Sequence, residues 1–523
     1  MERFIAKKIS SEELSILDNN CEWLGIPKSN LMECAGYSFV QEIIKHGFLK
    51  KNSKTIIFCG TGNNGGDGFV VARHLCSLGY PVIVALIGNP EKIRTDEAKI
   101  NWNIIKKGLT YSIDLQIIED SSDLNHLKEQ VQNDKEITLI IDGLLGTGIK
   151  GKIREPISSA IEIINNLKEE EQERLTVVSI DLPSGLNPDT GEVIDKAIKA
   201  DLVVTFHRLK LGMKKSSKYI KDIVEVSIGI PPEATIFVGY GNLQTTLKKR
   251  KVDNHKGEFG RVLVIGGSKN YSGAPAYSSF ACINFGCDLV ITYVPEVIGD
   301  VVRSYSPNMI VRTSPGDWLT IKALDELLWL IDWANTIIIG PGLGTETQTQ
   351  DLLIKLLEII KKEKKNVVLD ADALKLIKDH LDLIKGGNVI LTPHEGELKI
   401  LTGIELPNYN KIVERGDIIF NLAKKLDVTL LVKGPYDYIS DGKMLTINKT
   451  GCPEMSIGGT GDILAGLCAS LLTIGNKTFQ SACSAAFLNG YLGEYTKLHY
   501  GSHFTSMDML KNINGAIDQL RKV

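Results

Sequence analysis

Residues 55–68 read TIIFCGTGNNGGDG, and residues 69–78 continue as FVVARHLCSL. The run Thr55–Cys59 is apolar without alternation, which is typical of a strand buried on both faces of a sheet. A glycine-rich loop joins this run to the helical pattern Phe69–Leu78. A buried strand followed by a helix is the first half of a right-handed βαβ crossover. The stretch therefore predicts an α/β fold with a parallel sheet.

The same alternation of apolar runs and helical segments extends through the first half of the chain. It predicts a Rossmann-like three-layer αβα domain over residues 1–236. The further strands expected in this domain are Val82–Ile87, Ile137–Ile141, Thr176–Ile180, Leu202–Phe206 and Val224–Ile228.

The pattern breaks at Ile230-Pro231-Pro232, and a polar, basic stretch follows to Lys256. We place the domain boundary near residue 236, so that residues 237–523 form a second α/β domain. A hairpin is expected at Tyr436–Ser440, because the turn residues Asp441-Gly442 follow it. The other strands expected here are Arg261–Ile265, Asp288–Val294, Thr336–Ile339, Val367–Leu369, Val389–Leu391 and Thr429–Val432.

Composition excludes several classes of protein. The chain has 523 residues, 43% of them hydrophobic, with a formal net charge of −3, which is ordinary for a globular enzyme. The basic run Lys248–Lys251 indicates a solvated linker, so we expect no nucleic-acid partner. The nine cysteines form no Cys-x-x-Cys pair, which indicates reduced thiols. No signal peptide or bilayer-length apolar run is present, so we expect a cytoplasmic protein with no membrane partner.

The loop Gly60–Gly65 matches the dinucleotide fingerprint Gly-x-Gly-x-x-Gly. A dehydrogenase of that type carries a carboxylate at the end of the second strand, but here Gly88-Asn89 stand there. The loop therefore predicts a nucleotide site that is not of the usual dehydrogenase kind. The alternative is a glycine-rich turn whose Asp67 caps the following helix.

Two further polar loops follow strands, Asp142–Gly148 and Asp181–Gly185. Ligands of open parallel sheets bind at the carboxyl ends of strands, so we expect the three loops to share one crevice. Asn64, Asp142 and Ser184 supply hard oxygen ligands, which suit a group-I or group-II cation. Each aspartate taken alone is as typical of a turn or a cap.

The first half resembles the NAD(P)H-hydrate epimerase (YjeF N-terminal) family. The similarity lies in Gly60–Gly68 with Ala72-Arg73, and in the two loops just described. It implies that Asn64, Asp142 and Ser184 hold potassium. It also implies that Asp181 lies beside the substrate as the proton-transferring residue, with Lys152 as an electrostatic partner. The residues implied to contact the hydrated nicotinamide nucleotide are Asn63, Asn64, Gly65, Gly66, Asp67, Gly146, Thr147, Gly148, Ile149, Lys150, Gly151, Lys152 and Asp181. In Thr205–Lys210 the sequence departs from the family, which more often has proline where Leu209 stands.

In the second half, Gly458–Gly461 precedes the apolar helical pattern Ile463–Leu472. Glycines at a helix N-terminus expose N–H groups to an anion, and the helix dipole adds to the attraction. A carboxylate beside a phosphate is unfavourable for binding, so Asp462 is predicted to be a general base for a hydroxyl that accepts phosphate. The alternative is that Asp462 only stabilises the helix. His394 is predicted to contact substrate, although a lone histidine is more often structural. Asp370–Leu374 is expected to carry metal or to order the substrate loop, and the alternative is that it caps a helix.

These motifs resemble the ADP/ATP-dependent NAD(P)H-hydrate dehydratase (YjeF C-terminal) family, which has a ribokinase-like fold. The resemblance adds His255–Gly260, Tyr271–Ala274, Gly340–Gly344 and Leu391–Glu397, in family order. The residues it implies around the hydrated substrate are Ala274, Gly344, Asn388, Val389, Ile390, Leu391, Thr392, Pro393, His394 and Asp462. The residues it implies around the adenine nucleotide are Lys433, Gly434, Pro435, Tyr436, Asp437, Cys452, Pro453, Glu454, Met455, Ser456, Ile457, Gly458, Gly459, Thr460 and Gly461. Cys452 and Glu454 are departures from the family pattern.

The two resemblances imply repair of hydrated NADH and NADPH. The first domain would interconvert the R and S hydrates, and the second would dehydrate the S form with ADP or ATP and magnesium. The family also implies assembly into homo-oligomers. One alternative is a kinase for a pyridoxine-like or thiazole-like alcohol, which leaves the first domain unexplained. Another is a binding scaffold, which should lack the polar loops around Asn64, Asp142 and Asp181.

Overall fold

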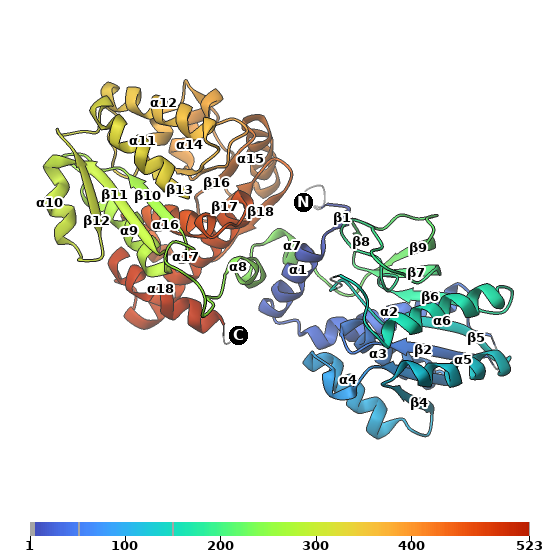
Figure 1. The fold of residues 1–523 in the computed structure, drawn as a ribbon. Helices are drawn as coiled ribbons and strands as arrows, with labels where there is room; N and C mark the ends of the chain where they lie inside the picture. Colours follow the sequence, from blue (N-terminus) through green and yellow to red (C-terminus); the bar gives the residue numbers. More distant parts are fainter. Residues whose placement is uncertain (1–5, 51–52, 149–150, 522–523) are drawn as a thin grey trace. The chain divides into compact units, whose positions relative to one another are not determined.

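The computed structural model describes residues 6–50, 53–148 and 151–521 (Figure 1). The chain forms two compact units, residues 6–231 and residues 232–523. The units divide between Pro231 and Pro232, whereas the sequence placed the change near residue 236, at the end of α7 (Pro232–Ile236). Within the described ranges, no helix is both long enough and apolar enough to cross a bilayer.

The first unit is built on a parallel sheet of seven strands in the order β4-β3-β2-β5-β6-β7-β9. A separate two-stranded sheet pairs β1 (Lys8–Ile9) with β8 (Leu209–Lys210). The strands of the main sheet are β2 (Lys54–Cys59), β3 (Val82–Ile87), β4 (Ile113–Ile118), β5 (Ile137–Gly143), β6 (Thr176–Ile180), β7 (Ala200–Phe206) and β9 (Ile220–Val226). The helices are α1 (Ser11–Trp23), α2 (Lys28–Lys45), α3 (Asn63–Ser77), α4 (Asp96–Gly108), α5 (Leu124–Asn133) and α6 (Ile157–Glu170).

Strand β2 shows why the unit has three layers. Ile56 and Phe58 belong to a core cluster with residues of α5 and α6. Cβ atoms alternate between the two faces of a strand, so Ile57 and Cys59 lie on the other face. A Cβ built on Gly68 of α3 would lie 2.7 Å from Cys59 Sγ and 3.4 Å from Ile57 Cγ2. Apolar residues on both faces of β2 thus hold one layer of helices each.

The crevice of the first unit lies where the strand order reverses. Strand β2 lies between β3 and β5, so the chain leaves β2 on one side and returns on the other. The connections that follow β2 and β5 lead to opposite faces of the sheet, and open parallel sheets bind ligands at the point where two such connections begin. A Cβ on Gly60 would lie 1.9 Å from Leu144 O, so only glycine lets the two loops approach this closely.

The second unit contains a nine-stranded sheet in the order β12-β11-β10-β13-β14-β15-β16-β17-β18. Strands β12 to β16 are parallel, and β16, β17 and β18 pair antiparallel. The strands are β10 (Arg261–Ile265), β11 (Leu289–Pro295), β12 (Ile310–Ser314), β13 (Thr336–Ile339), β14 (Asn366–Leu369), β15 (Val389–Leu391), β16 (Thr429–Val432), β17 (Asp437–Ser440) and β18 (Leu445–Asn448).

Helices cover both faces of this sheet (Figure 1). One face packs with α11 (Leu324–Trp333), α12 (Thr347–Lys362), α14 (Glu395–Thr402) and α15 (Ile412–Leu426) in one core cluster. The other face carries α9 (Gly273–Phe285), α16 (Thr460–Thr473), α17 (Thr478–Tyr500) and α18 (Ser506–Leu520). Shorter or more peripheral helices are α8 (Tyr240–Thr246), α10 (Glu296–Ser304) and α13 (Asp372–Leu376). The strand order reverses at β10 and β13, which places a second crevice at their carboxyl ends.

The predicted α/β class with two parallel-sheet domains is confirmed. The short strands β1 and β8 were not predicted. In the two main sheets β4 and β12 were missed, and β9 begins and ends earlier than the predicted Val224–Ile228. Strands β4, β9 and β12 all lie at sheet edges and are partly exposed. A half-exposed edge strand has no continuous apolar run, so the pattern that identified the inner strands does not mark it.

Candidate active sites

The first unit has a pocket at the carboxyl ends of its strands. It encloses about 720 Å³ including its mouth, a size suited to part of a nucleotide. Residues at the start of α3, in the loops after β5, β6 and β9, and at the end of β7 meet here with residues of α1, α2 and α4. The predicted site residues that line it together are Asn63, Asn64, Asp67, Gly146, Thr147 and Asp181.

The other residues implied for this site lie differently. Gly65 and Gly66 are buried in the first turn of α3, and a Cβ on Gly65 would lie 1.9 Å from Gly60 O, so they serve close packing. Gly148, Gly151 and Lys152 are exposed and do not line the pocket. Ile149 and Lys150 lie outside the described residues.

Asp181 has a backbone conformation that few non-glycine residues adopt, with φ of 61°. Such strain persists where the surroundings hold it, and it concentrates at functional sites. The Asp181 Oδ1 atom accepts hydrogen bonds from Phe206 N at 2.9 Å, from Thr205 Oγ1 at 3.2 Å and from the ammonium of Lys210. Lys210 is fully buried, and the sequence did not single it out. The cation beside Asp181 is therefore Lys210, in place of the predicted Lys152.

Asp67 and Asp18 add further carboxyl groups to the pocket. Burial, reinforced by the carboxylates of Asp181, Asp18 and Glu97, raises the pKa of Asp67 well above its ordinary value. Burial also raises the pKa of Asp18 to about 6, although Lys28 opposes the rise. Helix α3 has Gly62 as its N-cap and no side-chain cap, so Asp67 is not the helix cap that the alternative reading required.

Of the three residues predicted to hold a cation, Asn64 and Ser184 both contact Leu145, and Ser184 also contacts Asp142. The Asn64 amide and the Ser184 hydroxyl donate to Leu145 O at 3.1 and 3.2 Å, and Leu145 N donates to Ser184 Oγ at 2.8 Å. The fully buried Asp142 carboxylate accepts from Ser184 N at 2.9 Å and is the alternative acceptor for the single proton of the Ser184 hydroxyl. Among the described residues, only neutral groups contact this carboxylate, and burial raises the pKa of Asp142.

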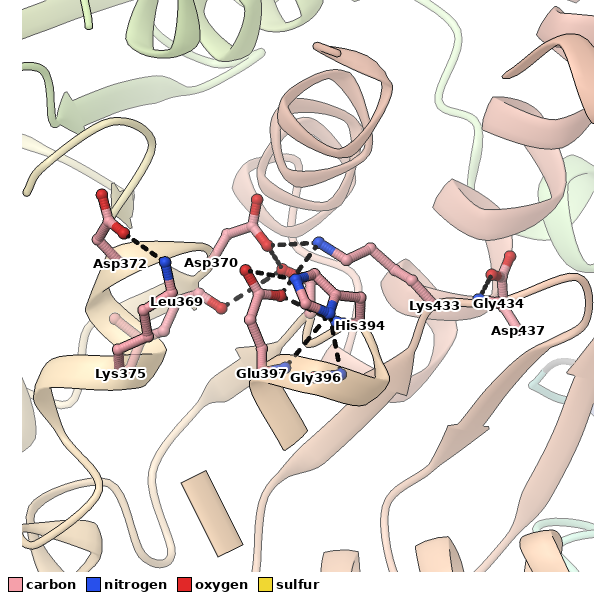
Figure 2. Close-up of polar contacts among 11 residues, drawn as sticks. Leu369, Asp370, Asp372, Lys375, His394, Gly396, Glu397, Lys433, Gly434 and Asp437 are labelled. Atoms are coloured by element: carbon pink, nitrogen blue, oxygen red, sulfur yellow. Dashed lines mark hydrogen bonds and ion pairs between the residues drawn. The ribbon is translucent and has the colours of Figure 1, made fainter. Parts of the chain in front are cut away.

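The second unit gathers charged side chains around Lys433, directly after β16 (Figure 2). Its ammonium donates to Asp370 Oδ1 at 2.9 Å and lies 3.8 Å from Glu397 Oε2. Thr392 Oγ1 donates to the same Asp370 oxygen at 2.7 Å. A Cβ built on Gly461 would lie 3.3 Å from Lys433 Nζ, so the ammonium lies beside the first turn of α16. The loops after β14, β15 and β16 thus meet the glycine-rich start of α16.

Asp462 lies in that first turn and is mostly buried. The N-cap of α16 is Gly459, with φ of 98° and no side-chain cap. Within the described chain, no residue forms a hydrogen bond with the Asp462 carboxylate, so it does not act as a cap. Burial, with the carboxylates of Asp370, Glu397 and Asp372, raises the pKa of Asp462 to about 8, although Lys433 opposes the rise. The group is therefore poised to exchange a proton near neutral pH.

His394 has a structural role in addition to the predicted contact with substrate. Its Nδ1 accepts hydrogen bonds from Gly396 N at 3.0 Å and Glu397 N at 3.3 Å, which caps α14 (Figure 2). Since Nδ1 is the acceptor, the ring proton is on Nε2, which lies 3.4 Å from Glu397 Oε1. The side chain is 59% exposed, so this edge of the ring remains accessible.

The predicted nucleotide segments Lys433–Asp437 and Cys452–Gly461 are both well defined. Asp437 closes the first by accepting from Gly434 N at 3.1 Å and from Asn448 Nδ2 at 3.0 Å, while burial raises its pKa to about 6. In the second, Thr460 Oγ1 donates to Met455 O and Ile457 O, each at 3.2 Å. Glu454, one of the departures, pairs with Lys497 at 2.8 Å, so it has a structural partner of its own.

The remaining predicted substrate residues divide into two groups. Gly344 N donates to Asp372 Oδ2 at 3.0 Å. A Cβ on Gly342 would lie 3.3 Å from Ala274 Cβ, so Ala274, in the first turn of α9, lies beside the loop that contains Gly344. Thr392 and Pro393 follow the end of β15, as expected. Asn388 and Val389 instead line a separate pocket with Lys361 and Lys365 at the amino end of β15, and Ile390 is fully buried. The structure therefore does not bring Asn388, Val389 and Ile390 together with Asp462.

Sequence reasoning missed four charged residues around the sites. Lys210, Asp18 and Glu97 belong to the first, and Glu397 to the second. Glu397 stands in a quoted motif, so its position after a strand end was a usable signal. Lys210 ends the quoted stretch Thr205–Lys210, but nothing in that stretch indicates its partner. Asp18 and Glu97 stand in no motif, and their partners lie far away along the chain.

Comparison with known proteins gives matches to both halves. Residues 28–212 match the family of the YjeF-related protein N-terminus, and residues 262–514 match the NAD(P)H-hydrate dehydratase family. The chain is 41% identical to a bifunctional NAD(P)H-hydrate repair enzyme Nnr of Methanothermobacter thermautotrophicus, over 99% of this chain and 96% of that protein. It is 39% identical to the enzyme of the same description from Pyrobaculum aerophilum, over 97% of each chain. Among solved structures, a ribokinase-like superfamily protein from Enterococcus faecalis has a TM-score of 0.48 and 24% identity, over 55% of this chain and 96% of its own.

Proposed function

Because the chain belongs to the family of bifunctional NAD(P)H-hydrate repair enzymes, we propose that its two crevices divide the repair between them. The chain is an NAD(P)H-hydrate epimerase and an ADP- or ATP-dependent NAD(P)H-hydrate dehydratase. The pocket around Asp181 interconverts the R and S hydrates, and the site around Asp462 dehydrates the S form. The observation that carries this division is the pair of unlike carboxylates. Asp181 is anchored by a buried lysine, whereas Asp462 has no hydrogen-bond partner among the described residues.

In the dehydratase site, Asp462 removes the proton of the substrate hydroxyl as it accepts a phosphoryl group. The N–H groups of Gly458–Gly461 and the ammonium of Lys433 stabilise the charge on the transferred phosphate. The phosphate then leaves with the C–O bond electrons, and loss of a ring proton restores the dihydropyridine. Phosphate is a much better leaving group than hydroxide, which is why a phosphate-binding site can drive a dehydration.

Magnesium fits this site as a companion of the nucleotide. In the described ranges no cluster of three His, Cys, Asp or Glu side chains could hold a metal alone. Magnesium is typically held by one or two carboxylates together with phosphate oxygens. Asp370 uses only Oδ1 for its bonds to Lys433 and Thr392, so Oδ2 is available for this, and Glu397 lies nearby. Bound there, magnesium would neutralise phosphate charge.

Potassium fits the epimerase site because Asp142 is buried and has only neutral partners in the described chain. A buried carboxylate without a cation is unfavourable, and a bound monovalent cation would offset the charge of Asp142. Asn64 Oδ1, Ser184 Oγ and an oxygen of Asp142 would hold the ion. Through Asn64 it would fix the start of α3, where Asn63 and Asp67 line the pocket.

Withdrawal of potassium is therefore expected to slow epimerisation. We expect exchange of R and S hydrates to fall by about tenfold or more when choline replaces potassium at constant ionic strength, because outer ligands that orient a site typically matter by about 10–100-fold. Dehydration of purified S hydrate in the same samples serves as the control and should be unchanged. Equal rates of epimer exchange in the two salts would contradict the assignment.

The dehydratase rate is expected to rise with pH. Asp462 must be ionised to act as a base, so kcat/KM for the S hydrate should show an acid limb with its midpoint near pH 8. Below that midpoint the rate should fall about tenfold per pH unit. The substitution Asp370→Asn removes a carboxylate that raises the Asp462 pKa, so the midpoint should move to lower pH. A midpoint that stays in place would contradict the proposed electrostatics.

The function itself is tested by adding the protein and ADP or ATP to a mixture of both hydrates. Recovery of reduced-cofactor absorbance from the whole mixture is the expected result. Accumulation of a stable phosphorylated product would instead support the kinase alternative, and no recovery would contradict both. We further propose a homo-oligomer, from the family resemblance, and a cytoplasmic protein with no nucleic-acid or membrane partner, from the composition and charge of the sequence.

A further inference from the structure

Lys210 of β8 is a fully buried cation in the epimerase unit. Its ammonium bonds Asp181 Oδ1, and it also bonds Thr205 Oγ1 and Phe206 O, each at 3.0 Å. An ammonium has three donors, so these three acceptors use all of them. Lys210 therefore has no donor left for a substrate, and any effect it has on the reaction passes through Asp181.

Asp181 is asymmetric as a result. All of its recorded hydrogen bonds, from Lys210, Phe206 N and Thr205 Oγ1, end on Oδ1. Within the described residues, Oδ2 has no partner, and Asp181 lines the pocket. One oxygen thus anchors the side chain, and the other is available to accept a proton from a ligand.

Asp67 has the opposite environment in the same pocket. No described residue forms a hydrogen bond or an ion pair with its carboxyl group. The charged groups that face it are Asp181, Asp18, Glu97 and Lys210, and the three carboxylates together with burial raise its pKa, whereas Lys210 lowers it. A carboxyl group that is bonded to a cation and a second one that faces other carboxylates in the same pocket can form an acid–base pair.

The chemistry of the substrate needs such a pair. Water adds to the enamine double bond of a dihydropyridine so that the hydroxyl is on the carbon next to the ring nitrogen. The stereocentre is then a hemiaminal carbon. Its configuration can change if the carbon–nitrogen bond opens to an aldehyde and closes again on the other face.

We propose that Asp181 is the base and Asp67 the acid of such a ring opening, and that Lys210 is the positioning residue that holds the Asp181 carboxylate through its Oδ1 atom. This inference rests on the proposed epimerase function and assigns its proton transfers. Asp181 removes the hydroxyl proton, and the O–H electrons form the C=O bond. The carbon–nitrogen bond pair moves to the ring nitrogen, where the conjugated carboxamide stabilises it, and the nitrogen takes the Asp67 proton. After rotation about the adjacent C–C bond, the reverse steps form the other epimer. No oxidant, reductant or added water is consumed.

The test uses the full chain and follows exchange of purified R hydrate without nucleotide. For Lys210→Met we expect kcat at pH 7 to fall by about 100-fold or more, KM to change much less, and the acid limb of the pH profile to move up by at least one unit. The separate variant Lys210→Arg keeps the charge, so the acid limb of its pH profile should lie at the wild-type position. A merely structural lysine would lower the rate equally at every pH.

The matched control is Lys168→Met, which removes another lysine paired with an aspartate in the same unit, Asp201 at 2.8 Å, and contributes nothing to the pocket. It should leave the pH profile unchanged. Dehydration of S hydrate by the same samples reports the state of the second unit. The variant Asp67→Asn is close to isosteric. Its pH profile should lose the alkaline limb and keep the acid limb. This variant therefore tests the pair of Asp181 and Asp67 even if Lys210→Met fails to fold.

Oxygen labelling tests the ring opening itself. In ¹⁸O-water we expect the exchanged hydrate to keep its original oxygen, because the oxygen stays on the carbon throughout. Solvent oxygen in every exchanged molecule, or Lys210→Met with wild-type kcat and acid limb, would overturn the inference. A wild-type chain that exchanges no epimers would instead overturn the proposed function.

Discussion

Replacing Asp462 with asparagine is expected to lower regeneration of NADH or NADPH from the S hydrate by about 10²–10⁴-fold, the usual contribution of a general base. The side chain lies in the first turn of α16 beside Lys433, and asparagine keeps its shape but cannot take a proton. Exchange of the R and S hydrates should continue at the wild-type rate, since that chemistry belongs to the other unit. The measurement is reduced-cofactor absorbance with ADP or ATP, beside epimer exchange without nucleotide.

The same variant gives a folding control through the pH dependence of its stability. The folded-state pKa of Asp462 is raised to about 8, above the ordinary value, so the native state holds a proton that the unfolded chain has lost. The stability of the wild-type protein therefore falls as pH rises from about 4 to about 8. Asparagine removes this effect, so Asp462→Asn should unfold at a higher temperature than the wild type at pH 8. A less stable variant, or one that also stops exchanging epimers, would contradict the assignment.

The substitution Asp181→Asn is expected to lower epimer exchange by about 10²–10⁴-fold while S hydrate is dehydrated normally. The neutral amide can still accept from Phe206 N, but it cannot remove a proton. Given both hydrates and ADP or ATP, this variant should convert the S hydrate and leave the R hydrate unconverted. Chromatography of the two epimers measures this outcome.

Asp181→Asn also leaves Lys210 as a buried cation without its anion, and breaking a buried pair costs about 3–5 kcal/mol. The double variant Asp181→Asn with Lys210→Met removes both charges, so it should regain stability and remain inactive in exchange. If the double variant exchanged epimers at the wild-type rate, Asp181 would not be the base.

Much of this architecture could be predicted because each inner strand is marked by a pattern within its own short stretch of sequence. Thr336–Ile339 and Val389–Leu391 are continuous apolar runs, and the structure places strands there with the predicted bounds. The membership in the hydrate-repair family implied by the motifs is also confirmed by the matches along the chain. The edge strands β4 and β12 were missed because partial exposure breaks such runs.

The parts of the sites that could not be predicted depend on contacts between distant residues. Lys210 looks like an ordinary surface lysine until β8 pairs with β1 and brings its ammonium to Asp181, 29 residues earlier. His394 was predicted from its loop, but its capping of α14 depends on the path of the backbone after β15. The family resemblance implied substrate contacts for all of Asn388–His394, and this segment contains the parallel strand β15. Only the residues after the carboxyl end of β15 face the site, whereas Asn388 and Val389 lie at its amino end.

The most direct test of two sites with divided work is to mix the two inactive variants. Purified R hydrate is given ADP or ATP with Asp462→Asn alone, with Asp181→Asn alone, and with both together. Each variant alone should restore no more reduced cofactor than spontaneous epimerisation allows, whereas the mixture should restore it fully, because one chain makes S hydrate and the other dehydrates it. A mixture no more active than Asp181→Asn alone would contradict the account.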